Sequence, residues 1–176
     1  MKPLSFTIER ATIKTQSVRM KELADGFGYI RISQFQERTA EDLAANINKL
    51  EKSGHLKGLI LDLRNDPGGL LQAAIGVSAA FLPEKSDVVS IKGRTPQSDY
   101  AFKAVEKDYR SGNAAKALAE LTPAAKTVPL VVLINSSSAS ASEIVAGALQ
   151  DHKRAVLWAT ALWQGICANH FAYDLR

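Results

Sequence analysis

Residues 58–69, with the sequence GLILDLRNDPGG, carry the clearest structural signal in this chain. The first half is a nearly continuous apolar run, which is typical of a strand in a sheet covered on both faces. The second half is a polar loop that ends in two glycines. The apolar positions after it, which predict a helix, are Leu70, Leu71, Ala74, Ile75, Ser78, Phe81 and Leu82. A buried strand, a loop and a helix in this order predict a parallel βαβ unit.

Similar elements flank this unit on both sides. Thr39 and Asp42 have the spacing of a capping box, and the apolar face of the helix they begin runs through Leu43, Ile47 and Leu50 until Gly54. Further strands are expected at residues 4–8, 29–32, 88–91 and 128–134, and a helix is expected at 144–149. The polar stretch 94–127 predicts an excursion from the core with a short helix at 114–121. The fold class is therefore α/β, built from βαβ units with right-handed crossovers.

The composition is that of a folded domain, either complete or part of a larger protein. The chain has 176 residues, of which 46% are hydrophobic and 23% charged. The longest apolar run, at 128–134, is too short to span a bilayer, and residues 1–20 lack the apolar centre of a signal peptide. A single cysteine, Cys167, excludes an internal disulfide framework and a cysteine cluster for zinc. The net charge of +4 is spread along the chain, which argues against a nucleic-acid binder.

Two loops follow buried strands, at the edge where parallel sheets bind ligands. In the first, at residues 66–69, Gly68 and Gly69 let the backbone approach a substrate and present N–H groups, as an oxyanion hole requires. A tight turn between a strand and a helix would explain the same residues.

The second loop, at residues 135–143, is rich in serine. Ser140 is placed at the start of a helix, where the dipole and the following free N–H favour an oxyanion. A simple N-cap and an anion-binding site are the alternatives, although no Gly-Lys-Ser/Thr follows as in a nucleotide-binding P-loop. A serine nucleophile needs a base. His55 lies beyond a helix end and His152 at the far end of the Ser140 helix, so a lysine base has to be considered.

Three stretches together resemble the carboxyl-terminal processing peptidases, also called tail-specific proteases. They are GYIRI at 28–32, KGLILDLRNDPGGL at 57–70 and SASASEIVAGALQD at 138–151. The resemblance covers residues 1–157. It implies a serine endopeptidase of bacterial envelopes or plastids that recognises the C-termini of its protein or peptide substrates. It also implies a spiral ββα-type core similar to the ClpP and crotonase fold, with a PDZ domain that delivers the substrate.

The resemblance also assigns roles to individual residues. Ser140 is the expected nucleophile, the N–H groups of Gly69 and Ala141 are the expected oxyanion hole with Gly68 as second choice, and Asp151 matches an acidic supporting position. Residues 1–18 would be the end of a PDZ domain and its connector, and residues 19–157 the peptidase core. No cofactor, metal or nucleic acid is expected. A periplasmic or membrane-associated envelope location and self-association through exposed apolar surface are further expectations.

One departure from the family pattern concerns the base. The family completes its Ser-Lys dyad with a lysine downstream of the serine, but that position is Gly165 here, and no lysine follows Lys153. Residues 158–176 also hold both tryptophans and only two charges. Shifting the codons of residues 163–171 by one base allows the sequence Gly-Lys-Gly-Ser-Val-Gln, which fits the family motif. The hypothesis is that the chain after Leu157 is translated out of frame, which the nucleotide sequence at that point would test.

Two functions from different classes follow. The first is a serine endopeptidase whose nucleophile half is present and whose base is missing, so that little or no peptidase activity is expected. The alternative is a non-catalytic peptide-binding or assembly module on the same core. A crotonase-type acyl-transfer enzyme is disfavoured because that group lacks the SASASE signature.

Overall fold

The main structural element is a five-stranded sheet. The computed structural model describes residues 16–92 and 99–159, so the expected strand at residues 4–8 lies outside the described part. The sheet has the order β1-β2-β3-β6-β7. Its strands are β1 (Val18–Glu22), β2 (Phe27–Ile32), β3 (Gly58–Asp62), β6 (Leu130–Ile134) and β7 (Val156–Ala159). Only the pair β1 and β2 is antiparallel, which confirms the α/β class and the parallel βαβ units.

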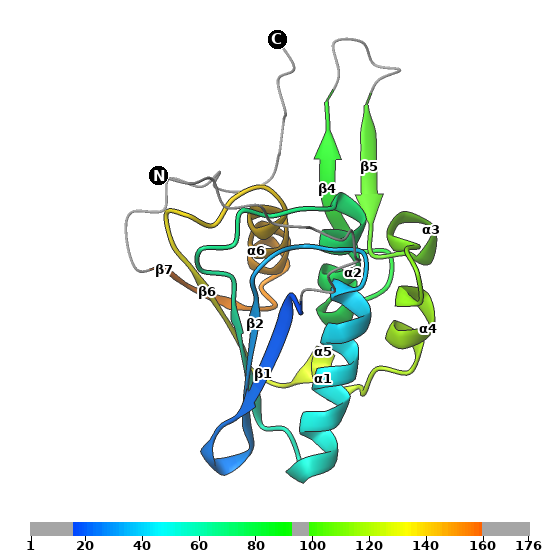
Figure 1. Cartoon of the computed structure of the whole chain (residues 1–176). Coiled ribbons are helices and arrows are strands. Elements are labelled where there is room, and N and C mark those ends of the chain that lie inside the picture. The colour runs from blue at the N-terminus through cyan, green and yellow to red at the C-terminus, as the bar shows by residue number, and fades with distance from the viewer. Residues whose placement is uncertain (1–15, 93–98, 160–176) are drawn as a thin grey trace, which may run out of the picture.

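Three helices lie on one face of this sheet (Figure 1). They are α1 (Thr39–Gly54), α2 (Leu71–Phe81) and α6 (Ala141–Asp151), and each belongs to a crossover between parallel strands. Helix α2 packs against both α1 and α6. All of its residues from Ala73 to Phe81 are buried. A helix that is apolar on every side needs such a central position.

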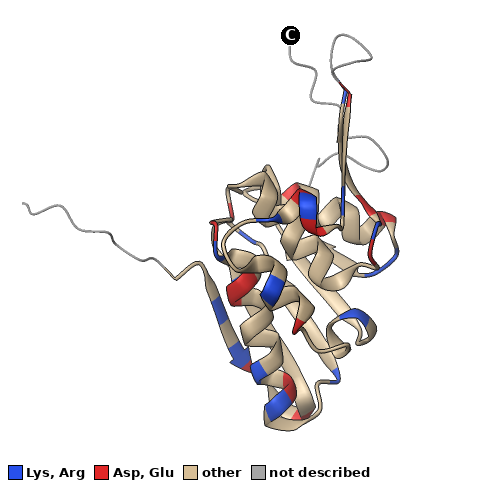
Figure 2. Cartoon of the chain, turned by 90° about the vertical axis from the view of Figure 1, so that its right-hand side faces the viewer, with Lys and Arg blue, Asp and Glu red and all other residues tan. Residues whose placement is uncertain are grey.

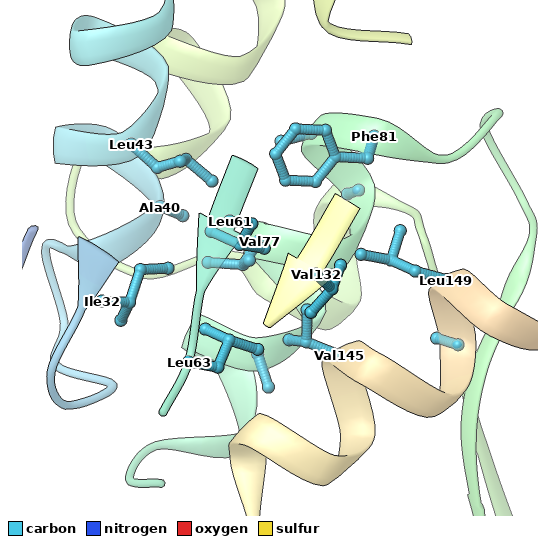
Figure 3. Close-up of a cluster of buried hydrophobic side chains, with 14 of the residues drawn as sticks. Ile32, Ala40, Leu43, Leu61, Leu63, Val77, Phe81, Val132, Val145 and Leu149 are labelled. Atoms are coloured by element: carbon cyan, nitrogen blue, oxygen red, sulfur yellow. The ribbon is translucent and has the colours of Figure 1, made fainter. Parts of the chain in front are cut away.

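The core lies between the sheet and these helices (Figure 3). It brings together Leu43 of α1, Leu61 of β3, Phe81 of α2, Val132 of β6 and Leu149 of α6, none of which is more than 1% exposed. Burying each such large side chain stabilises the fold by about 1.5 to 3 kcal/mol. The apolar patterns of the sequence therefore predicted the elements that make up the core.

The expected capping box of α1 is wrong. Thr39 is the first helical residue and not the N-cap, which is Arg38. The Thr39 hydroxyl oxygen accepts the N–H of Gln36 (2.8 Å) and lies 3.2 Å from the hydroxyl of Ser17. Its side chain thus fixes the turn before the helix and joins it to the residue before β1.

The strand expected at 88–91 forms, but not in the main sheet. This strand, β4 (Asp87–Ile91), pairs antiparallel with β5 (Tyr100–Lys103) in a hairpin that projects from the body (Figure 1). The partner of β3 in the parallel sheet is β6 instead. The polar excursion continues with the short helices α3 (Glu106–Tyr109), α4 (Ala114–Ala119) and α5 (Ala124–Thr127), of which α4 is the helix expected there.

Both expected segment boundaries fall within strands of the main sheet. Val18 begins β1, is fully buried and pairs with Ile32. At the other end, β7 continues past Leu157 to Ala159 and pairs with β6. The rest of the segment interpreted as out of frame, residues 160–176, lies outside the described part of the chain.

The surface shows basic and acidic residues interspersed along the helices, with further basic residues on β1 (Figure 2). Within residues 16–92 and 99–159, no helix has the length and apolar character needed to cross a membrane.

Candidate active site

The two loops singled out in the sequence meet at the carboxyl ends of β3 and β6. These strands are parallel neighbours, so the loops that leave them start side by side. The Asn135 side chain donates to the Asn65 side-chain oxygen (2.8 Å) and accepts the Asn65 N–H (3.0 Å). The Ala139 N–H donates to the carbonyl oxygen of Asp66 (3.1 Å). The Asp66-Pro67-Gly68-Gly69 loop and the serine loop therefore form one unit.

The three alternate serines of the SASAS motif have different environments. Ser138 is 4% exposed, and its hydroxyl donates to the Leu63 carbonyl oxygen at the end of β3 (2.8 Å). Ser142 is fully buried, and its hydroxyl donates to the Asp66 carbonyl oxygen (3.1 Å). Ser140, between them, is only partly buried. The hydrogen bonds of the outer two serines hold the loop in place, and the middle serine is the most exposed of the three.

Ser140 lies on a strained turn that leads into α6. Its φ of 53° and ψ of −114° belong to a region that residues other than glycine rarely adopt. The Glu143 carboxylate accepts the Ser140 N–H (2.8 Å), and the Ser140 carbonyl oxygen accepts the N–H of Glu143 (2.9 Å). A serine on such a turn between a strand and a helix has the backbone geometry of a nucleophile elbow.

Gly68 and Gly69 are required where they lie. Their φ values are 97° and 147°, in the region that favours glycine. A Cβ on Gly68 would lie 2.8 Å from the Ser140 Cβ and from the Ala141 nitrogen. A Cβ on Gly69 would clash with the Phe35 carbonyl oxygen. Any side chain at either position would therefore displace the backbone next to Ser140 or Phe35.

The N–H groups near Ser140 are not equivalent. The Gly68 N–H donates to the Asp66 carboxylate (2.8 Å), so it is already engaged. The Leu70 N–H donates to the Phe35 carbonyl oxygen (2.9 Å). The N–H groups of Gly69 and Ala141 have no acceptor among the residues that the structure describes. Of the three expected oxyanion donors, these two are the ones available to bind a ligand.

Asp66 itself is a buried carboxylic acid beside Ser140. It is 0% exposed, and its Oδ2 atom has no hydrogen-bond partner in the described part of the chain. Burial raises the pKa of Asp66 to about 6, although the hydrogen bond from the Gly68 N–H, the nearby Ser142 hydroxyl and the positive charge of Arg31 act in the opposite direction. In the sequence, Asp66 was predicted only as part of a turn.

A second buried aspartate, Asp62, anchors a charged network that no sequence motif indicated. The Arg64 guanidinium donates to both Asp62 oxygens (2.9 and 2.7 Å), and the Tyr29 hydroxyl donates to Oδ2. Arg31 lies 3.5 Å from the same oxygen. Burial acts to raise the pKa of Asp62, but the hydrogen bonds from Arg64 and Tyr29 outweigh it, so this pKa lies below its usual range. The signal in the sequence that could have indicated this network is Asp62 itself, a charged residue within an otherwise apolar strand.

The remaining predicted residues lie away from Ser140. Asp151 is exposed at the last position of α6. At a rise of about 1.5 Å per residue, it is roughly 16 Å from the Ser140 end of the helix. His152, next in sequence, has its ring Nε2 2.7 Å from the Asp87 carbonyl oxygen, and His55 is exposed at the C-cap of α1. The structure thus brings Gly68, Gly69 and Ala141 to Ser140, but not Asp151 or these histidines.

No group of three or more His, Cys, Asp or Glu residues suited to a metal occurs among residues 16–92 and 99–159. What the described site offers is a serine hydroxyl, two N–H donors and a half-satisfied buried carboxylic acid. This combination suits acyl transfer, in which a hydroxyl attacks a carbonyl group and the N–H donors stabilise the oxyanion.

Curated relatives of this chain include two carboxy-terminal processing proteases. A "Carboxy-terminal-processing protease" of Bartonella bacilliformis is 44% identical over 162 residues, which cover 90% of this chain and 33% of that protein. The "Carboxy-terminal processing protease CtpA" of Bacillus subtilis is 34% identical over 172 residues, or 97% of this chain and 33% of that protein. The chain therefore spans about a third of the length of these relatives.

Two solved structures have a fold similar to that of this chain. The photosystem II D1 C-terminal processing protease superposes with a TM-score of 0.59 at 26% identity, covering 82% of this chain and 36% of that one. A lipoprotein from Streptococcus agalactiae superposes with a TM-score of 0.58 at 20% identity, covering 81% of this chain and 49% of its own, and supports the fold alone. The profile of Peptidase family S41 matches residues 26–172. This chain belongs to peptidase family S41.

Proposed function

We propose that this chain carries the nucleophile half of a serine endopeptidase site that acts near the C-termini of proteins or peptides. The observation that supports it most is the placement of Ser140. It is the partly exposed serine between two buried, hydrogen-bonded ones, and it lies on a strained turn at the start of α6. The relatives are carboxy-terminal processing proteases, and their names suggest the substrate class.

In this proposal the Ser140 Oγ attacks the substrate carbonyl carbon. The carbonyl oxygen becomes an oxyanion that accepts hydrogen bonds from the N–H groups of Gly69 and Ala141, both of which lack an acceptor in the described structure. Gly68 contributes by its close approach to Ser140, because its own N–H is held by Asp66. Asp151, at the far end of α6, has no direct role in this step.

The proposed site has no residue assigned as the general base for Ser140. A serine hydroxyl is a weak nucleophile until a neighbouring group removes its proton, and the resemblance assigns this task to a lysine. No lysine follows Lys153 in the sequence, and Lys153 lies just beyond the end of α6 that is distant from Ser140. We therefore expect very slow acylation and no measurable peptide turnover by the 176-residue chain. An envelope location and self-association also belong to this proposal.

Labelling with a fluorophosphonate tests the assignment. The Ser140 Oγ would attack phosphorus and release fluoride, and mass spectrometry of the digested protein locates the modified residue. We expect slow labelling at Ser140, none in Ser140→Ala, and unchanged labelling in Ser137→Ala, a matched control at an exposed neighbouring serine. Labelling at another serine would overturn the assignment of the nucleophile. Rapid, Ser140-dependent peptide cleavage would contradict the proposed lack of a base.

A non-catalytic peptide-binding module is the second candidate, and the missing lysine favours it. It predicts that a peptide with a free C-terminus binds equally well to the unmodified chain and to Ser140→Ala, and that no serine reacts with the probe.

A further inference from the structure

Asp66 accepts three separate hydrogen bonds, one within its own loop and two from the serine loop and the start of α6. Its side-chain Oδ1 accepts the Gly68 N–H (2.8 Å). Its backbone carbonyl oxygen accepts the Ala139 N–H (3.1 Å) and the Ser142 hydroxyl (3.1 Å). One residue thus binds a glycine of its own loop and the residues on both sides of Ser140.

The side-chain bond fixes the part of the loop that touches the serine. An aspartate that accepts the N–H two residues further on closes an Asx-turn, which restricts the backbone of the residues between. The glycine held in this way is the one whose absent Cβ would lie 2.8 Å from the Ser140 Cβ and the Ala141 nitrogen. A rotation of the Gly68 peptide would therefore be transmitted to the serine turn and to the neighbouring Gly69 N–H.

We propose that Asp66 is a positioning residue that holds the Gly68-Gly69 backbone against the Ser140 turn, so that the N–H groups of Gly69 and Ala141 act on one oxyanion. This inference rests on the proposed function for what the two N–H groups bind. The anchoring of Gly68 does not depend on it.

The hydrogen bond from the Gly68 N–H requires an acceptor atom at Oδ1 of Asp66 and not a negative charge. Oδ2 makes no bond within the described residues and is buried. The charged group that acts on Asp66 is Arg31 of β2, whose guanidinium pairs with Asp62 (3.5 Å). From α6, the Ser142 hydroxyl faces Asp66 and donates to its backbone carbonyl oxygen. Asparagine, which keeps the side-chain oxygen and lacks the charge, should therefore replace Asp66 with the site intact, whereas alanine should not.

The test compares Asp66→Ala with Asp66→Asn and uses Asp62→Asn as a matched control at the other buried aspartate. The first readout is the backbone ¹H–¹⁵N spectrum with amide hydrogen exchange. We expect Asp66→Ala to shift the Gly68, Gly69 and Ala141 resonances and to accelerate Gly68 exchange at least about tenfold through loss of its acceptor. Asp66→Asn and Asp62→Asn should leave Gly68 protected. Unchanged Gly68 protection in Asp66→Ala would overturn the proposal.

The second readout is the affinity for a peptide boronic acid, which forms a tetrahedral adduct with a serine. We expect about a tenfold loss in Asp66→Ala and less than about a threefold loss in Asp66→Asn. If the unmodified chain does not bind the boronic acid, the proposed function fails, while the exchange readout still decides the anchoring. Should Asp66→Ala not fold, the pH titration of the Gly68 resonance decides instead. It should follow the ionisation of Asp66 and disappear in Asp66→Asn, and a Gly68 resonance insensitive to that ionisation would contradict the proposal.

Discussion

Asp62 and Asp66 lie four residues apart on the same segment, and neither is exposed to solvent, yet their surroundings are opposite. Asp62, at the end of β3, accepts hydrogen bonds at both oxygens from Arg64 and also from Tyr29. Asp66, in the loop that follows, has one side-chain bond, from Gly68, and a buried oxygen without a partner in the described structure.

The pKa values follow this difference. The pKa of Asp62 lies below its usual range, because its hydrogen bonds outweigh burial, whereas the pKa of Asp66 is raised to about 6, because burial dominates there. Burial of a carboxylate is therefore not in itself the mark of a functional site in this molecule. The fully paired aspartate supports the sheet, and the half-paired one lies in the loop that contacts the Ser140 turn.

The largest effect is expected from Asp62→Ala. This change leaves two arginines and a tyrosine hydroxyl without their shared acceptor, so we expect a loss of about 3 to 4 kcal/mol in the free energy of unfolding, measured in urea. Asp42→Ala is the control, because Asp42 also pairs with an arginine, Arg38, but at the surface (3.4 Å). Its loss should stay below about 1 kcal/mol. Equal losses of unfolding free energy in the two variants would show that the buried network stabilises the fold no more than the surface ion pair does.

The next effect is the pH dependence contributed by Asp66. Because its pKa is raised on folding, the folded chain binds a proton more tightly than the unfolded chain, and the stability from this group falls as pH rises from about 4 to about 6. Relative to Asp66→Asn, the unmodified chain should gain about 2 to 3 kcal/mol between pH 7 and pH 4. If the stability difference between the unmodified chain and Asp66→Asn stays constant across this pH range, or changes with the opposite sign, the pKa of Asp66 is not raised by folding. The two aspartates would then not differ in this respect.

A smaller effect is expected at Glu143, which accepts the N–H of Ser140. Glu143→Ala removes this acceptor and should cost about 1 kcal/mol of stability, as loss of a helix cap does, and loosen the strained serine turn. Glu143→Gln keeps a side-chain oxygen and should lose less than half of that. Urea unfolding measures both. If glutamine proves as damaging as alanine, the carboxylate charge and not the hydrogen bond supports the turn.

The smallest effect is expected at Asp151. It is exposed at the opposite end of α6 from Ser140, so Asp151→Asn should change the free energy of unfolding by less than about 0.5 kcal/mol. Fluorophosphonate labelling should keep its rate. A clear fall in that rate would restore the supporting role that the resemblance gave to this residue.

Much of the site was predictable from the sequence, because Gly69 and Ser140 each follow a buried strand and parallel neighbours end at the same edge. The hydrogen-bond and ion-pair network around Asp62 was not predictable. Tyr29 and Asp62 come from strands about thirty positions apart, and only the parallel register of β2 and β3 places them together. The pairing of β4 outside the main sheet was not predictable, because its partner β5 lies in a polar stretch without a clear strand pattern.

The most direct measurement of the central claim is the ¹¹B spectrum of a peptide boronic acid bound to the chain. Adduct formation needs the serine oxygen and the oxyanion donors, but not repeated turnover by a base. We predict a tetrahedral boron signal with the unmodified chain and with Asp151→Asn, and its loss in Ser140→Ala. Trigonal boron with the folded, unmodified chain, or a tetrahedral signal that persists in Ser140→Ala, would contradict the assignment of Ser140 as the nucleophile.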